Sequence, residues 1–167
     1  MKWVLIVVAV LILFVALVAV AGMILPKAHV ASRSSRFKRP PQAIWDAITG
    51  PPDWRPDIRS FENLPPLNGH RSWAETDKHG QTIAYESIEE VPNARLVTRI
   101  ATEKLPFGGT WTQEIKTRAD GCELTITEAG EIYNPIFRFM ARFVFGYSGS
   151  IETYLKALHN KFGEAGN

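Results

Sequence analysis

The chain has 167 residues and a formal net charge of +2 at pH 7, and 46% of its residues are hydrophobic. This length favours one folded domain, and the small net charge argues against a nucleic-acid partner. One cysteine excludes a disulfide within these residues, and the four histidines show no metal-ligand spacing. We therefore expect no metal and no cofactor.

An uncharged segment from Trp3 to Leu25 stands near the start of the chain. It is long enough to cross a hydrocarbon core of about 30 Å, so we expect a single-pass transmembrane anchor over residues 1–26 and a folded domain over residues 27–167. A cleaved signal peptide is the competing interpretation, because residues 19–21 resemble a small-residue cleavage site. The apolar run continues past that site, which favours the uncleaved anchor.

The charges that flank this segment are compatible with either side of the membrane. Basic residues from Lys27 to Arg39 outnumber Lys2, a count that places the domain in the cytoplasm. Most of those residues, however, fall in the first predicted strand and loop, and the short start is typical of an exported signal anchor. The linker to the domain is short, so the domain must lie close to the bilayer surface.

One strand and two short helical segments are predicted after the anchor. The strand covers residues 28–37, with Val30 as its main apolar residue. A short helix follows over residues 41–48, and prolines end it. Asp53 is then placed to cap a second helical turn that holds Trp54.

Six strands follow, because apolar and polar residues alternate between turn residues. We expect these strands at residues 58–67, 71–77, 81–91, 95–102, 109–117 and 122–133. Asp120-Gly121 is the clearest hairpin signal, and it makes Cys122 a buried strand residue rather than a nucleophile. Threonines and charges on one face, with apolar residues on the other, indicate an antiparallel sheet with one buried face.

A long helix is predicted from residue 134 to residue 162. Pro135 takes its first position, and apolar residues then recur in steps of three and four. Gly146 and Gly149 interrupt the pattern, so we expect a kink or break there. A lone helix after a run of strands must bury its apolar face against the concave side of the sheet.

This order of elements resembles the helix-grip fold of the START-like (SRPBCC) superfamily, and in particular its polyketide cyclase/dehydrase and lipid-transport branch. The segments that carry the resemblance are residues 41–48, 54–58, 91–97, 108–111 and 130–139. The resemblance implies an α+β fold in which a curved antiparallel sheet surrounds a long C-terminal helix, with a hydrophobic cavity between them. It implies no common set of catalytic residues, and the N-terminal anchor is a departure from the minimal domain.

Large side chains of the sheet and helix are candidates to line such a cavity, since aromatic walls with a few polar groups suit a lipid-like or aromatic ligand. The candidate ligand-binding residues are Trp54, Trp73, Tyr85, Phe107, Trp111, Glu128, Arg138, Met140, Phe143 and Tyr147. Trp54 either acts as a lid at the cavity mouth or caps the core. Phe107 is interpreted as the exposed tip of a flexible loop, which acts as a gate or a membrane contact. For each aromatic residue taken by itself, the alternative to ligand binding is that the side chain simply packs in the apolar core.

Glu128 is the polar residue that departs most clearly from the pattern. It continues the inward face of Leu124 and Ile126, and a buried carboxylate needs a partner or a raised pKa. We expect Arg138 to be that partner, and we expect Arg99 to face solvent. Glu128 then either forms a structural ion pair or acts as an acid/base or ligand-orienting group, the weak catalytic candidate of this chain.

The first half of the C-terminal helix, from Phe137 to Phe145, carries phenylalanines around the whole cylinder together with Arg138 and Arg142. A helix with so little polar surface is expected to lie against the bilayer or under a loop. In the first case the arginines reach toward the headgroups.

These observations favour a membrane-tethered START-like domain that binds a hydrophobic small molecule or lipid without covalent chemistry. The alternatives are a polyketide cyclase/dehydratase-type enzyme that uses a cavity carboxylate, and a protein-interaction module. The sequence offers no paired carboxylates, nucleophile–base set or phosphate-binding loop in support of an enzyme. The expected partners are therefore the apolar ligand and the membrane, and the oligomeric state is left open.

Overall fold

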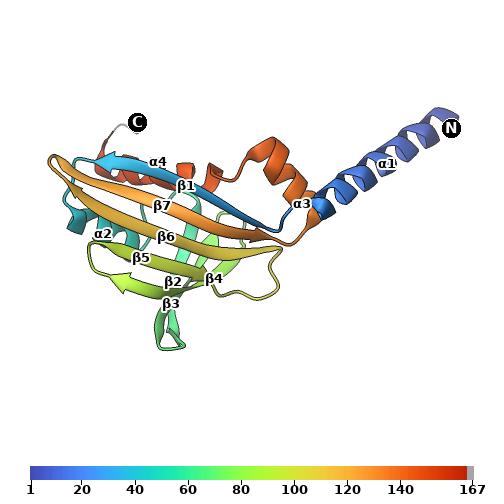
Figure 1. Ribbon diagram of the computed structural model, residues 1–167. Coiled ribbons are helices and arrows are strands. Elements are labelled where there is room, and N and C mark those ends of the chain that lie inside the picture. Colours follow the sequence, from blue (N-terminus) through green and yellow to red (C-terminus); the bar gives the residue numbers. More distant parts are fainter. Residues whose placement is uncertain (165–167) are drawn as a thin grey trace.

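A seven-stranded antiparallel sheet forms the centre of the computed structural model, which describes residues 1–164 (Figure 1). The strands are β1 (Ala28–Phe37), β2 (Ile58–Leu67), β3 (His70–Asp77), β4 (Thr82–Val91), β5 (Arg95–Ile100), β6 (Phe107–Arg118) and β7 (Gly121–Ile132). Their order in the sheet is β1-β7-β6-β5-β4-β3-β2, so the first strand of the sheet pairs with the last. The helical segments are α1 (Lys2–Ile24), α2 (Pro41–Thr49), α3 (Pro135–Met140), the π-helical turn η1 (Ala141–Phe145) and α4 (Gly149–Phe162).

The predicted α+β architecture is confirmed, and the hairpin at residues 118–121 joins β6 to β7 as expected. Cys122 is 1% exposed in β7, and burial raises the pKa of its thiol to about 11.

The segment around Asp53 forms isolated turns instead of the expected helical turn, with the Arg55 amide donating to the Pro52 carbonyl at 3.0 Å.

Val30, the main apolar residue expected in β1, does not contribute to the core. Val30 is 71% exposed, whereas Phe37 is 2% exposed and packs in the core. Since side chains alternate along a strand, the burial of Phe37 also turns Ala31 and His29 toward the concave side. The strand holds too few apolar residues for its pattern to reveal this orientation.

The apolar core lies where α4 and α2 pack on the sheet. Ile151 and Leu158 of α4 are fully buried against Leu124 and Ile126 of β7, and Ile44 of α2 belongs to the same cluster. This packing closes one part of the concave face. The rest of that face remains open beneath the segment that precedes α4.

The predicted long helix is broken, as the glycines indicated. Asn134 caps α3 by accepting hydrogen bonds from the amides of Ile136 and Phe137, and the helical path continues through η1. Gly146 then takes a φ of 75°, a conformation that favours glycine, before α4 begins. The break separates α4 on the sheet from α3, which lies beside the end of α1 (Figure 1), and from η1, which continues α3.

α1 is the one helix among residues 1–164 that is long and apolar enough to span a membrane, with a mean hydropathy of 3.5. It projects away from the sheet at the end where β1 begins and β7 ends (Figure 1). Most of its side chains are exposed, and its contacts with the domain are made to α3.

Candidate ligand-binding cavity

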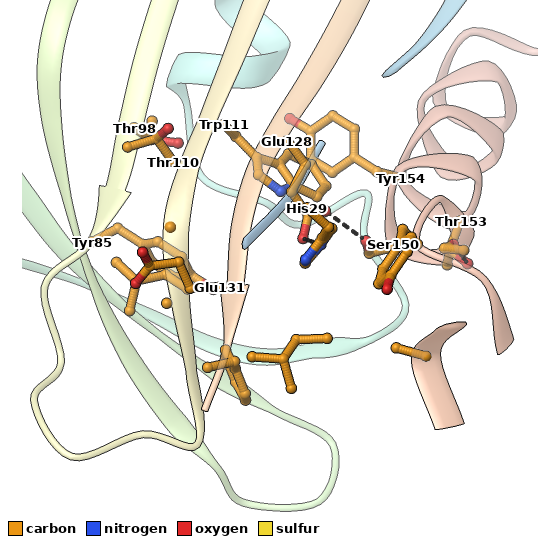
Figure 2. Close-up of a pocket in the computed structure, with 18 of the residues that line it drawn as sticks. His29, Tyr85, Thr98, Thr110, Trp111, Glu128, Glu131, Ser150, Thr153 and Tyr154 are labelled. Atoms are coloured by element: carbon orange, nitrogen blue, oxygen red, sulfur yellow. Dashed lines mark hydrogen bonds and ion pairs between the residues drawn. The ribbon is translucent and has the colours of Figure 1, made fainter. Parts of the chain in front are cut away.

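A cavity of about 750 Å³ lies between the concave face of the sheet and the segment formed by α3, η1 and the start of α4. This volume is within the range of sites that bind small molecules, roughly 300–1,000 Å³. Figure 2 shows side chains from β1, the central strands and α4 converging on it.

Aromatic side chains form much of the wall. Trp73 of β3 stacks on Tyr85 of β4 with ring centroids 5.8 Å apart, and Tyr154 of α4 meets the ring of Trp111 edge-on at 5.5 Å. Burial raises the pKa of Tyr85 well above its ordinary value and that of Tyr154 to about 12. A phenol is neutral at pH 7 even at its ordinary pKa of about 10, so both groups keep a proton to donate.

An ion-pair network closes one end of the cavity. Arg55 lies 2.7 Å from the carboxylate of Asp57 and 2.8 Å from that of Glu75, which also accepts a hydrogen bond from the indole of Trp73 at 3.1 Å. Burial lowers the pKa of Arg55, but the two carboxylates outweigh it and the net shift is upward. Because these charged groups are already paired with one another, the network holds the end wall of the cavity in place and has no unpaired charge to attract an ionic ligand.

A second polar cluster surrounds Glu128 at the other side of the cavity. Its carboxylate lies 3.4 Å from Nε2 of His29 and accepts a hydrogen bond of 3.1 Å from Ser150 (Figure 2). The imidazole of His29 in turn stacks on Tyr147, with centroids 4.3 Å apart. Side chains from β1, β7 and α4 thus meet around one carboxylate.

The position of His29 depends on a glycine. His29 pairs with Gly130 across β1 and β7, and a Cβ atom at position 130 would lie 2.4 Å from Cε1 of the imidazole. Nδ1 of His29 is buried and has no hydrogen-bond partner among residues 1–164. The polar contact of the imidazole is therefore made through Nε2, toward Glu128.

Seven of the ten residues proposed from the sequence line the cavity. They are Trp73, Tyr85, Phe107, Trp111, Glu128, Met140 and Tyr147. Phe107 is nevertheless not an exposed loop tip, since it is the first residue of β6 and is partly buried. Its strand begins two residues earlier than the alternation indicated, because Gly108 and Gly109 also pair with β7.

Three proposed residues lie outside the cavity wall. The indole of Trp54 donates to the Ala47 carbonyl at 3.1 Å and packs in the core, so it is no lid. Phe143 is 63% exposed, and its ring contacts that of Phe139 at a centroid distance of 4.9 Å. Arg138 is buried, but it binds backbone carbonyls.

The expected ion pair between Glu128 and Arg138 is wrong. Arg138 donates to the carbonyls of Leu25 and Tyr133, at 2.8 Å and 3.3 Å, and this leaves His29 and Ser150 as the partners of Glu128. The contact of Arg138 with Leu25 arises from the approach of α1 to α3, whereas the contact with Tyr133 is local. The sequence pattern of the strand and helix holds no information about that approach.

Arg99 is half exposed, as expected, but it also pairs with a carboxylate that the sequence did not single out. Glu86 of β4 is 1% exposed and lies 2.6 Å from Arg99, whose hydrogen bond lowers the pKa of the carboxyl. This pair lies outside the cavity and stabilises the sheet.

Sequence reasoning missed the polar groups that the fold brings into the cavity from distant segments. His29 was considered only as a possible metal ligand, and its alternation with Phe37 along β1 would have placed it on the concave side. Arg55 lies in a turn, where no periodicity indicates direction. Ser150 reaches Glu128 only because the helix is broken before it.

Comparison with known proteins identifies the fold and not the activity. No family model matches the chain, and no curated protein matches it. Protein MLL2253 from Mesorhizobium loti superposes with a TM-score of 0.63 at 14% identity, covering 81% of this chain and 97% of that one. Norcoclaurine synthase from Thalictrum flavum gives 0.61 at 12% identity, covering 83% and 88%. The fold is the helix-grip, START/Bet v1-like fold.

A third helix-grip neighbour is the di-domain ARO/CYC StfQ from the steffimycin biosynthetic pathway. It superposes with a TM-score of 0.58 at 13% identity, covering 78% of this chain and 49% of StfQ. The chain thus spans about half of that protein. At such identities the shared helix-grip fold carries no conclusion about shared chemistry.

Proposed function

We propose that this chain is a membrane-tethered binding protein that holds an apolar small molecule or lipid in its cavity. The observation that carries the proposal is the volume of about 750 Å³ between the sheet and the helical segment, with its aromatic walls. Burial of apolar ligand surface contributes about 25 cal/mol per Å² before the costs of association. The site is therefore suited to a largely hydrocarbon or aromatic ligand.

The polar groups of the cavity indicate that this ligand has at least one polar group. Neutral phenols at Tyr85 and Tyr154 supply hydrogen-bonding positions at separate points of the wall. The charged side chains of the Arg55 network are already paired. A ligand with a hydroxyl or carbonyl group on an apolar body fits this arrangement better than a highly charged one.

The tether in this proposal is α1. Its 23 residues contain no charge after Lys2, and their length matches a hydrocarbon core. A binding domain held at the bilayer surface meets apolar molecules where they are concentrated.

Titration with N-phenyl-1-naphthylamine, an apolar aromatic probe, tests the binding function. The full chain in nanodiscs is compared with protein-free nanodiscs and with the Thr98→Trp variant. Thr98 lines the cavity beside its cross-strand neighbour Trp111, so a larger side chain at position 98 fills the cavity. Lys116→Trp, on an exposed part of β6, is the matched control. Binding that is lost in Thr98→Trp and retained in Lys116→Trp supports the proposal, and equal binding by both variants contradicts it.

A second candidate function is acid/base catalysis on a bound apolar substrate, as in an enzyme of cyclase or dehydratase type. The observation that favours it is the pairing of His29 with Glu128 inside the cavity, because two adjacent titratable groups can relay a proton. Incubation of a ligand identified in the cavity with the wild type and with Glu128→Gln tests this function. Conversion by the wild type alone, with ligand still bound by the variant, assigns catalysis; unchanged ligand in both assigns binding only.

A further inference from the structure

We propose that α3 and η1 lie within the membrane interface and form the portal through which the apolar ligand passes directly between the bilayer and the cavity. This inference rests on the proposed function, since it assumes that α1 spans the membrane and that the cavity holds an apolar ligand. Beyond that function, the inference gives the place at which the ligand enters the cavity. It also names the lipid bilayer as the partner of the exposed surface of α3 and η1.

The first observation is that the end of α1 is packed against α3. Gly22 is buried in this contact, and a Cβ atom at position 22 would lie 1.9 Å from the carbonyl oxygen of Pro135. Val18, one turn earlier, is the other buried residue of α1. Close approach of two helices through a glycine is a common way for helices to associate in membranes.

The second observation is that Arg138 fixes this junction. Its guanidinium donates to the carbonyl of Leu25, directly after the last turn of α1, and to the carbonyl of Tyr133, just before α3. Carbonyls at a helix end have no partner within the helix, and near the hydrocarbon region water is scarce. A buried arginine that satisfies the Leu25 carbonyl suits a junction at the membrane boundary. The Ile132 amide adds a third connection by donating to the carbonyl of Lys27 at 2.9 Å.

The junction sets the depth of α3 in the membrane. From Val18 to Leu25 a helix rises about 10 Å, so α3 flanks roughly the last third of a segment that spans the bilayer. If α1 crosses the membrane, α3 therefore cannot stand clear of the headgroup region. Figure 1 shows α3 and the turn after it on the side of the domain from which α1 projects.

The third observation concerns the outer surface of this segment. Phe137 is 53% exposed, Phe143 63%, Val144 58% and Phe145 72%. Four large apolar side chains within nine residues are unfavourable in water and favourable at the boundary of headgroups and acyl chains. Arg142, exposed among them, can extend its charge to the headgroups.

The same segment is also a wall of the cavity. Phe137, Met140, Ala141 and Phe145 line it, and Phe137 and Phe145 are the two of these that are largely exposed as well. A side chain that lines a cavity and is open to the outside marks its rim. The rim thus coincides with the surface that α1 holds against the bilayer, and an apolar ligand can enter without crossing water.

A bilayer is favoured over a protein partner because the exposed surface is continuous with α1. The surface begins one turn after Asn134, where α3 contacts the end of α1, and it continues through η1. A protein partner on the same surface would have to displace lipid from beside a spanning helix.

Fluorescence quenching tests the placement. The full chain with Phe145→Cys is labelled with NBD and reconstituted in phosphatidylcholine nanodiscs that contain doxyl-labelled lipid. Asp120→Cys, in the exposed turn between β6 and β7 away from α1, is the control, and buried Cys122 is not expected to react. The proposal expects the label at position 145 to lose most of its fluorescence and the label at position 120 to keep it. Equal fluorescence at both positions overturns it.

The rate of uptake tests the portal itself. The double variant Phe143→Asp, Val144→Asp changes exposed residues of η1 that do not line the cavity. It should take up N-phenyl-1-naphthylamine from phosphatidylcholine vesicles about tenfold more slowly, which corresponds to about 1.4 kcal/mol on the barrier. The amount bound at equilibrium should change little. Leu67→Asp with Val91→Asp, exposed apolar residues of β2 and β4, is the matched control and should keep the wild-type rate. A slowed control or an unchanged double variant overturns the portal.

The two tests separate this inference from the function on which it rests. If the label at position 145 is quenched but no probe binds, the proposed binding function is contradicted, while the placement of α3 and η1 in the membrane interface is supported. Probe binding without quenching at position 145 leaves the function and overturns the membrane portal.

Discussion

Nε2 of His29 lies 3.4 Å from the carboxylate of Glu128, although 99 residues separate the two in the chain. Their proximity follows from the pairing of β1 with β7, which sets His29 opposite Gly130 and Ala31 opposite Glu128. The first strand of the sheet thereby contributes a titratable group to a cavity that is otherwise built by later strands and α4. The arrangement depends on the absence of a side chain at Gly130.

Substitution of Gly130 by alanine should displace His29 from Glu128. The added Cβ atom would lie 2.4 Å from the imidazole and 3.0 Å from the carboxylate, so one of them must move. We expect a loss of about 1–3 kcal/mol in the free energy of unfolding, typical of overpacking, together with weaker probe binding. Chemical denaturation and probe titration measure the two effects.

The matched control is Gly149→Ala. No atom lies within 4 Å of a Cβ atom built at Gly149, the first residue of α4. This variant should keep both stability and binding, since alanine favours helix more than glycine does. Equal behaviour of the two alanine variants would contradict the account of His29.

The junction between α1 and α3 should loosen when Gly22 is replaced by leucine. The larger side chain cannot fit against the carbonyl of Pro135, so α1 must separate from α3. We expect the amides at the start of α3 to exchange hydrogen about tenfold faster in nanodiscs, as local opening becomes easier. Mass spectrometry of hydrogen exchange measures this change, and Val20→Leu on the exposed face of α1 is the control. Unchanged exchange in Gly22→Leu would show that the two helices are not held together by this contact.

Stability should decrease as the pH falls through the range where histidine titrates, and His159 should account for part of this decrease. His159 is buried, stacks on Phe37 at 4.2 Å and shares a hydrogen bond of 2.7 Å with Ser35. Burial lowers its pKa below the ordinary value, and the carboxylate of Glu164 opposes that shift in part. The unfolded chain therefore binds this proton more readily than the folded one.

The stabilisation is complete above the ordinary histidine pKa of about 6.5 and is lost as the pH falls below it toward the lowered pKa of the folded state. Thermal unfolding between pH 7.5 and pH 5.5 should show a falling midpoint for the wild type. His159→Phe, which keeps an aromatic ring on Phe37, should show a flatter dependence. The same slope in both proteins would exclude His159 as its source.

The sheet and the broken helix could be predicted because their signals are local. Alternation in the strands on either side of Asp120-Gly121 fixed the hairpin, and Gly146 marked the break before α4. The inward direction of Glu128 followed from the same alternation. Such patterns report which side of an element is buried.

The partners of Glu128 could not be predicted in the same way. They depend on the order of the strands in the sheet, which places β1 beside β7, and on the approach of α1 to α3, which occupies Arg138. The Arg55 network likewise joins a turn to β3. These relations between distant segments leave no periodic trace in the sequence.

The measurement that tests the central claim most directly is native mass spectrometry of the full chain released from lipid nanodiscs. The account predicts a stoichiometric apolar ligand that co-purifies with the wild type and is absent from Thr98→Trp, and the mass of that ligand would give its class. A folded wild-type domain with no bound molecule would contradict the claim that this cavity holds an apolar ligand.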